Sequence, residues 1–241
     1  MPTLSPSNSL RQSLVVALCL FLPIASAQAD YDTAPFLRWV ETSLAVEGIP
    51  GSAVAIVTPD KVLHLQTWGK RKADANALVT SNSLFRIASM SKTFAGAAAT
   101  LVVDSQRVDW DTRMSDIFPR LHLGNGRSYR EITLKQVASH STGLMPHSYS
   151  NLLDDGVDYA AIKPRFADIP AVCKPGTCYG YQNVVFSLIA DVVEESTGDD
   201  YAGFLEQQLF KPLGMTTASV GLEPYSASRD ATRPHRKGRG T

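Results

Sequence analysis

The strands that the sequence predicts are confined to one short stretch near the start of the chain. Residues 52–58 and 62–68 are each typical of a β-strand, and the pair Pro59-Asp60 between them is typical of a turn, so together they predict a hairpin. An isolated two-stranded hairpin is marginally stable in water and leaves both of its edges unpaired. The sequence therefore predicts an α+β fold, in which a helical region accompanies a short antiparallel sheet that is incomplete.

Helical patterns account for most of the remaining chain. Before the hairpin, Phe36, Val40 and Leu44 recur every four residues, and Gly48 is expected to end that helix. After the hairpin, one segment that ends just before Gly198 is apolar nearly all round, so we expect it to be buried. The helices predicted after the hairpin cover residues 89–104, 133–139, 184–196 and 200–210.

The charge balance excludes one class of function. Lys plus Arg count 23 and Asp plus Glu count 23, so the formal net charge is zero. Without a basic excess the chain lacks the electrostatic footprint of a nucleic-acid-binding protein. Hydrophobic residues make up 44% and charged residues 19% of the 241 residues, which excludes a disordered or fibrous chain. A catalytic or small-molecule role remains open.

The first 27 residues have the layout of a cleavable secretory signal. Arg11 precedes an apolar run over residues 14–24, and Ala25-Ser26-Ala27 supplies a small-x-small cleavage site. The apolar run is much shorter than the roughly 20 residues that a spanning helix needs, so no stable membrane anchor is expected. We therefore expect a periplasmic or secreted protein that begins at Gln28 after cleavage.

Two cysteines remain once this signal is removed. Cys173 and Cys178 bracket a turn sequence with Pro and Gly at its centre, and export places them in an oxidising compartment. The spacing also fits half of a metal site, but no His or acidic residue lies nearby in sequence to complete one. We therefore predict a Cys173–Cys178 disulfide, which would contribute about 2 kcal/mol through loop-closure entropy.

A Ser-x-x-Lys pattern is the first candidate for catalysis. Ser89 and Lys92 lie three apart at the start of a predicted helix, so the amine can reach the hydroxyl on the same face. A serine hydroxyl needs a neighbouring base, and burial would favour the uncharged amine of Lys92. The amides at the start of the helix would stabilise an oxyanion. By itself the pattern is weak, because a Ser N-cap with a surface Lys would look the same.

A Tyr-x-Asn pattern supplies a second candidate. Tyr181 and Asn183 are two apart on an extended segment, so their side chains point to the same side. Tyr181 could move a proton while Asn183 hydrogen-bonds a substrate carbonyl. Tyr149-Ser150-Asn151 is a second literal match, which we interpret as a polar loop.

Two of the histidines between these motifs are candidates for metal ligands. His140 and His147 are seven apart and the sequence suggests no third ligand, so we interpret them as core or loop histidines rather than a metal site.

Four blocks occur in order along the chain: FRIASMSKTF at residues 85–94, LKQVASHSTGL at 134–144, PGTCYGYQN at 175–183 and FKPLGM at 210–215. Together they resemble the beta-lactamase-related serine hydrolases, which include class C beta-lactamases, DD-carboxypeptidases and similar esterases. The resemblance covers nearly all of the chain after the signal.

The resemblance implies a role for each candidate. Ser89 would be the acylated nucleophile, Lys92 its partner on the helix, Tyr181 the general base and Asn183 a residue that orients the substrate. It further implies attack on an amide, β-lactam or ester carbonyl of a small molecule or peptide, through a covalent acyl-enzyme, without metal or cofactor. The oligomeric state is left open.

One element of the family pattern has no credible match. The family carries a Lys or His, any residue, and then Gly on a strand well after Tyr-x-Asn. Lys174-Pro175-Gly176 precedes Tyr181 and contains a proline that cannot donate from a central strand, while His235 and Lys237-Gly238 lie in the polar tail. We therefore expect a truncated member that lacks its C-terminal third and is weakly active or inactive alone. The alternative is a non-catalytic binder of peptidoglycan-like peptides or an inactive fragment.

The predicted organisation has four parts. Residues 1–27 form the signal peptide, and residues 28–83 form the N-terminal helix and hairpin of the α/β part. Residues 84–226 form a mainly helical region that carries both motifs, and residues 227–241 form a polar tail whose end is expected to be frayed and solvated.

Overall fold

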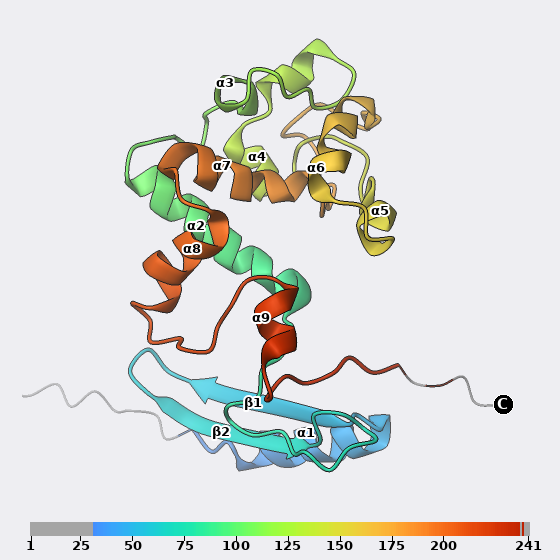
Figure 1. Cartoon of the computed structure of the whole chain (residues 1–241), viewed down its shortest axis with the longest axis vertical. Coiled ribbons are helices and arrows are strands. Elements are labelled where there is room, and N and C mark those ends of the chain that lie inside the picture. The colour runs from blue at the N-terminus through green and yellow to red at the C-terminus, as the bar shows by residue number, and fades with distance from the viewer. Residues whose placement is uncertain (1–30, 237, 239–241) are drawn as a thin grey trace, which may run out of the picture.

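The computed structural model describes residues 31–236 and residue 238, and its main parts are a helical region and a smaller N-terminal unit (Figure 1). The N-terminal unit consists of α1 (Ala34–Glu47) and a hairpin of β1 (Gly51–Val57) and β2 (Val62–Gly69). The two strands are antiparallel, and within the described residues they make up the whole sheet. The predicted mixture of a helical region with a short antiparallel sheet is confirmed.

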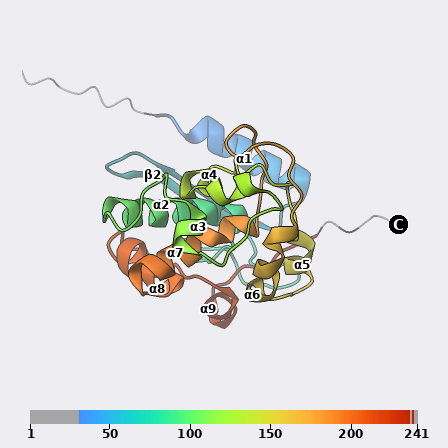
Figure 2. The same ribbon diagram turned by 90° about the horizontal axis from the view of Figure 1, so that it is seen from above.

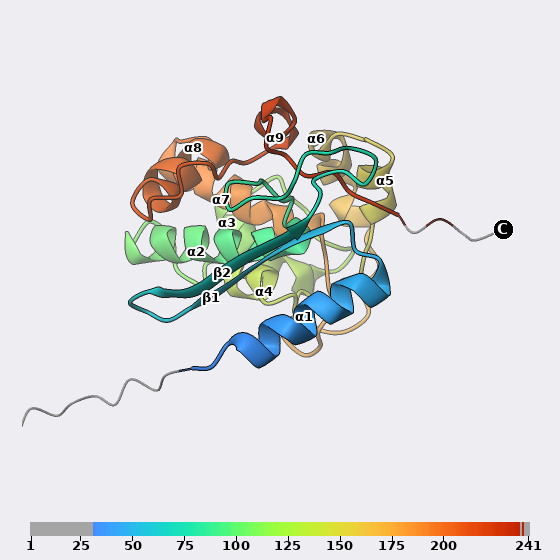
Figure 3. The same cartoon turned by 90° about the horizontal axis from the view of Figure 1, so that it is seen from below.

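Local signals fix the ends of α1. Pro35 occupies the first turn, where its missing N–H costs no hydrogen bond. Gly48 ends the helix in the left-handed conformation, with φ of 65°, and the following N–H of Ile49 returns to the carbonyl of Leu44 at 3.0 Å. Val40 is the buried residue of this helix, and Figure 3 shows α1 running beside the hairpin.

The helical region begins with a 3₁₀ turn, η1 (Ala88–Met90), that continues directly into α2 (Ser91–Asp104). Its longer helices match the predicted ones, although the segment predicted over residues 184–196 starts as a 3₁₀ turn and the one over 200–210 ends as a π-helix. The elements after α2 are α3 (Met114–Ile117), η2 (Arg127–Glu131), α4 (Leu134–Ala138), α5 (Ser150–Asp154), α6 (Tyr159–Ile162), η3 (Lys163–Asp168), η4 (Val185–Ser187), α7 (Leu188–Thr197), α8 (Tyr201–Leu205), η5 (Glu206–Phe210) and α9 (Leu222–Ala227).

The core of this region forms where α2 packs against α7, as seen from above in Figure 2. Ala98 and Ala99 are fully buried on α2, and their small side chains let the two helices approach closely. Ile189 and Val192 are buried on α7, which confirms that this helix is the buried one. Because α2 is held at the centre of the core, the residues at its start are fixed in position.

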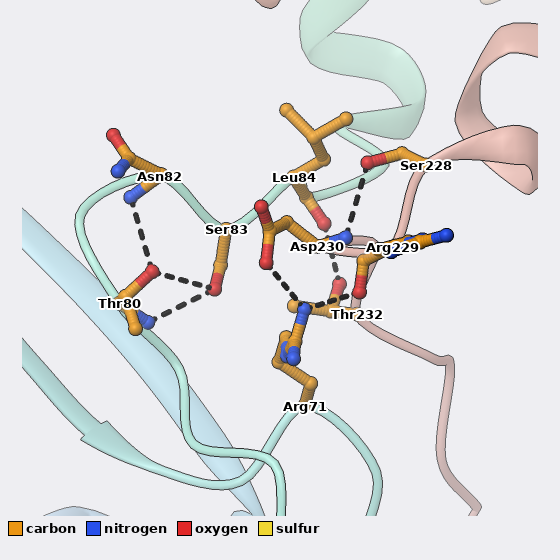
Figure 4. A network of polar contacts seen from close by, with 9 residues as sticks. All are labelled: Arg71, Thr80, Asn82, Ser83, Leu84, Ser228, Arg229, Asp230 and Thr232. Atoms are coloured by element: carbon orange, nitrogen blue, oxygen red, sulfur yellow. Dashed lines mark hydrogen bonds and ion pairs between the residues drawn. The ribbon is translucent and has the colours of Figure 1, made fainter.

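Residues 229–235, which follow α9, are bonded to the rest of the fold and are not a solvated end. The N–H of Leu84 donates to the carbonyl of Asp230 at 3.0 Å, and the N–H of Thr232 donates back to the carbonyl of Leu84 at 2.9 Å. Arg71 donates to the carbonyl of Arg229 and to the Asp230 carboxylate (Figure 4). We call residues 229–235 the strap.

For residues 229–235 the strap corrects the prediction of a frayed, solvated tail, whereas residues 237 and 239–241 lie outside the described residues. Ala231 and Thr232 are buried, and the hydroxyl of buried Tyr225 donates to the carbonyl of Thr232. The pairing joins positions about 150 residues apart, so local polarity could not reveal it. The strap ties the N-terminal unit to the start of the helical region.

The sequence also predicts a signal peptide and no stable membrane anchor. The predicted signal at residues 1–27 lies outside the described residues. Among the residues that the structure describes, no helix combines the length and apolar character needed to cross a membrane.

Candidate active site

Ser89 lies on η1, two residues before the start of α2, and its side chain is exposed. The preceding residue, Ala88, has a φ of 45°, in the left-handed region that costs an L-residue roughly 1–2 kcal/mol. Backbone strain of this kind persists only where the surrounding structure enforces it, and strained residues are frequent at functional sites. The rigid α2 therefore presents Ser89 on a strained turn at its N-terminal end, where helix amides favour negative charge.

Two side chains contact this serine, and a third contacts one of them. The Ser89 Oγ is 2.7 Å from the Tyr181 hydroxyl and 3.4 Å from the Lys92 Nζ. The Lys92 Nζ also donates to the Asn183 Oδ1 at 2.9 Å. The structure thus brings together all four residues that the two motifs nominated, from segments about 90 residues apart in the chain.

The neighbours of Tyr181 in this cluster change the pKa of its hydroxyl. The pKa of Tyr181 is lowered from its usual value of 10, first by hydrogen bonding with Lys92 and then by hydrogen bonding with Ser89. The Lys92 Nζ also lies 4.8 Å from the centre of the Tyr181 ring. A cation so close favours the phenolate, and a phenolate at 2.7 Å from a serine hydroxyl is placed to accept its proton. Because Lys92 is only half-buried, it acts here as a cation and not as the uncharged amine that the sequence predicted.

Asn183 makes contacts that differ from its expected role. Its Oδ1 accepts from Lys92, and its Nδ2 donates to the Ser150 Oγ at 3.4 Å. In this arrangement Asn183 holds the Lys92 amine toward Ser89. Ser150 starts α5, so the interpretation of Tyr149-Ser150-Asn151 as a polar loop is wrong for its last two residues, and Ser150 contacts the site through Asn183.

Two further residues next to Tyr181 were not nominated as part of the site. His140 is buried, and its Nδ1 accepts the N–H of Gln182 at 3.2 Å. The N–H of His147 donates to the carbonyl of Tyr181 at 2.9 Å. The block at residues 134–144 carries His140 and pointed to this region, but no spacing rule pointed to contact with Tyr181.

A disulfide joins Cys173 and Cys178, with 6.3 Å between their Cα atoms. The turn that it closes rests on the segment after α4: the N–H of Gly176 donates to the carbonyl of Ser141 at 2.7 Å. Gly143 lies beneath this turn with a φ of 77°, and a Cβ there would be 2.3 Å from the carbonyl oxygen of Cys173. The disulfide loop therefore anchors the chain just before it reaches Tyr181.

The literal matches to the pattern of Lys or His, any residue, and Gly lie outside this cluster of side chains. Lys174-Pro175-Gly176 form the turn inside the disulfide. The Nε2 of His235 accepts the N–H of Ala73 at 2.9 Å, within the strap. Within the described residues, no group of three or more His, Cys, Asp or Glu is arranged to hold a metal ion.

Comparison with known proteins gives one family match. A family model described as Beta-lactamase matches residues 36–241. Penicillin-binding protein 4 of Amycolatopsis lactamdurans is 27% identical over 170 residues, which cover 69% of this chain and 44% of that protein. An unguisins hydrolase of Aspergillus campestris is 29% identical over 209 residues, which cover 80% of this chain and 37% of that protein.

A solved structure has a similar fold. The octameric penicillin-binding protein homologue from Pyrococcus abyssi superposes with a TM-score of 0.71 at 20% identity, over 84% of this chain and 47% of that one. The chain spans less than half the length of each of these three proteins. At this identity the structural likeness concerns the fold.

Proposed function

Because this chain belongs to the beta-lactamase family, we propose that it is a serine hydrolase that cleaves an amide, ester or β-lactam carbonyl through a covalent acyl-enzyme on Ser89. The single observation that carries the proposal is the position of the Ser89 Oγ, at 2.7 Å from the Tyr181 hydroxyl and 3.4 Å from the Lys92 Nζ. A serine hydroxyl becomes a nucleophile when a base removes its proton, and these two groups are within reach of it.

In the acylation step, the Tyr181 phenolate accepts the proton of Ser89 while the Oγ forms a bond to the substrate carbonyl carbon. The carbonyl oxygen takes up the negative charge, which the amides at the start of the helix stabilise. When this intermediate collapses, the carbonyl–nitrogen or carbonyl–oxygen bond breaks and Tyr181 returns its proton to the leaving group. The Lys92 ammonium stabilises the Tyr181 phenolate before it accepts the proton and again after it has returned the proton.

In the hydrolysis step, water takes the place of the leaving group. Tyr181 accepts a proton from the water, whose oxygen attacks the acyl carbon, and then returns the proton to the Ser89 Oγ as the ester bond breaks. Asn183 keeps Lys92 in place throughout, because its Oδ1 accepts from the Lys92 Nζ at 2.9 Å.

The proposal is tested by the site of covalent labelling. The protein is incubated with a fluorophosphonate, which forms an oxygen–phosphorus bond with an activated serine and releases fluoride. Intact mass and peptide mapping should place one adduct on Ser89, and Ser89→Ala should abolish it. Ser91→Ala is the matched control, because Ser91 is a neighbouring exposed serine at the start of α2. An adduct that persists in Ser89→Ala, or no adduct at all, would contradict the proposal and favour a non-catalytic binder.

We further propose that the protein works in the periplasm or outside the cell. The layout of residues 1–27 and the Cys173–Cys178 disulfide support this location, because disulfides persist in oxidising compartments. Expression of the full chain in bacteria, followed by cell fractionation, should yield a protein outside the cytoplasm with Gln28 at its N-terminus. An uncleaved cytoplasmic product would contradict this proposal.

A further inference from the structure

One buried histidine holds the chain on both sides of Tyr181. The carbonyl of His140 accepts the N–H of Gly180 at 2.8 Å, and its Nδ1 accepts the N–H of Gln182 at 3.2 Å. His140 itself is in the left-handed conformation, with φ of 55°, which directs its ring and its carbonyl to the same segment. Both neighbours of Tyr181 in the sequence are thus bound to one residue.

The ring of His140 also packs against the tyrosine. The ring centres of His140 and Tyr181 are 4.5 Å apart, and the ring of Phe186 covers His140 at 4.9 Å. His140 is only 9% exposed, so its ring has little freedom to rotate. These contacts set the direction in which the Tyr181 hydroxyl points.

The hydrogen bond from the N–H of Gln182 requires that the imidazole of His140 be uncharged. An Nδ1 that accepts a hydrogen bond carries no proton, so the ring proton is on Nε2. The titratable groups that face the ring are Lys92 from α2 and Tyr179 and Tyr181 from the segment after the disulfide, while η4 contributes only Phe186. Burial first, and then the charge of Lys92, lowers the pKa of His140 below its usual value of 6.5.

We propose that His140 is a positioning residue for the reaction, which holds Tyr181 against Ser89 and does so only as a neutral imidazole. The proposal rests on the proposed function of Ser89 and Tyr181. It adds that the reaction slows at acid pH, because His140 becomes protonated there. His140 has this effect without touching the reacting atoms.

The physical consequence of protonation is direct. A protonated Nδ1 is a donor that faces another donor, the N–H of Gln182, so their hydrogen bond is lost. The new charge also lies near Lys92, whose ammonium repels it. The segment that carries Tyr181 then moves away from Ser89, and a displacement of about 1 Å of a catalytic group costs on the order of 100-fold in rate.

The pH dependence of Ser89 labelling separates the two titrating groups. Tyr181 must lose its proton to act, so the logarithm of the rate rises with a slope of one as pH rises toward the pKa of Tyr181, which lies below 10. If His140 must also be neutral, the slope becomes two below the pKa of His140. The rate constant of fluorophosphonate labelling, measured from about pH 5 to about pH 10, reports both slopes.

Two variants isolate the acceptor atom. In His140→Asn, the Oδ1 can replace Nδ1 as acceptor but does not titrate, and Asn tolerates the left-handed backbone. In His140→Gly the backbone is equally tolerated, but the acceptor is gone. We expect His140→Asn to label within a few-fold of wild type at high pH with a slope of one throughout, and His140→Gly to label at least tenfold more slowly. Equal rates in the two variants, or a slope of two in His140→Asn, would overturn the proposal.

A readout that does not need activity separates this proposal from the proposed function. The pKa of Tyr181, followed by NMR of ¹³C-labelled tyrosine, should stay low in His140→Asn and rise toward 10 in His140→Gly, because Tyr181 leaves Lys92. Nitrogen-15 shifts of His140 should show the proton on Nε2 at neutral pH. If wild-type Ser89 fails to label, the proposed function fails. A proton on Nδ1, or an unchanged pKa of Tyr181 in His140→Gly, would overturn the positioning role instead.

Discussion

The helical region and the N-terminal unit differ in how many of their side chains are buried. In residues 84–226, Leu144 and Phe166 are among many side chains with no exposed surface. In the described part of residues 28–83, the buried apolar side chains are Val40 and Val79, and Trp39 remains 64% exposed. The helical region therefore has its own core, whereas the N-terminal unit buries few side chains and contacts the strap through hydrogen bonds.

This difference explains where the candidate site lies. All four side chains of the site come from the helical region: Ser89 from η1, Lys92 from α2, and Tyr181 and Asn183 from the segment that leads into η4. Catalytic groups must be held within fractions of an ångström, and a packed core provides that rigidity. The predictions below test this contrast, from the largest expected effect to the smallest.

The largest effect is expected from removing an aromatic ring in each part. Phe166→Ala empties a fully buried position and should lower the free energy of unfolding by about 3–5 kcal/mol. Trp39→Ala removes an exposed ring that stacks on Phe36 at 5.9 Å, and should cost less than about 1 kcal/mol. Urea denaturation measures both. Similar losses in the two variants would refute the contrast between the two parts.

A pair of left-handed glycines gives the next effect. Gly143→Ala meets backbone strain and a contact of 2.3 Å with the carbonyl oxygen of Cys173, so we expect a loss of about 2–4 kcal/mol and slower labelling of Ser89. Gly48→Ala meets the same strain with nothing within 4 Å, so it should cost only about 1–2 kcal/mol and leave labelling unchanged. If Gly48→Ala proves the more damaging, the packing around the disulfide loop is not as described.

The disulfide should contribute about 2 kcal/mol. Replacing Cys173 and Cys178 together by serine removes a short closed loop, and loop-closure entropy sets the size of the effect. Thermal unfolding compares this variant with the oxidised wild type. Reduction of the wild type should reproduce the loss, and a variant as stable as the oxidised protein would show that the loop is held by its hydrogen bonds alone.

The smallest effect is expected at the strap. Arg71→Ala removes the contacts with Asp230 and with the carbonyl of Arg229, and because Asp230 is half exposed the loss of stability should stay below about 1 kcal/mol. Amide hydrogen exchange at Leu84 and Thr232 should nevertheless become faster, because the N-terminal unit is less firmly tied.

Lys72→Ala is the control for this prediction. Lys72 forms an ion pair with Asp74 at 3.1 Å beside the same loop, and both side chains are mostly exposed. Its removal should leave exchange at Leu84 unchanged. Exchange that stays slow in Arg71→Ala would show that main-chain pairing suffices to hold the strap.

Local patterns in the sequence predicted the fold where one segment carried the whole signal. Gly48 and Gly198 mark helix ends, and both are left-handed caps in the structure. The hairpin was predicted over 52–58 and 62–68 and occurs over Gly51–Val57 and Val62–Gly69. Apolar periodicity and turn residues are local, so they can be detected without knowing the fold.

Features that depend on distant contacts could not be predicted in this way. The short helices α3, α5 and α6 are too brief to show a period, and the strap pairs with residues that lie far away in the sequence. The same holds within the site. Ser89, Lys92, Tyr181 and Asn183 were nominated from motifs, whereas His140 and Ser150 show their contacts with the site only in three dimensions.

The central claim is that Tyr181 acts as the base for Ser89, and the rate of Ser89 labelling in two tyrosine variants tests it most directly. Tyr181→Phe should label about 10²–10⁴-fold more slowly than wild type and lose the rise with pH, because the phenolate is gone. Tyr179→Phe, which removes an exposed hydroxyl two residues away, should follow the wild-type profile. A Tyr181→Phe protein that labels at the wild-type rate, with the wild-type dependence on pH, would contradict the claim.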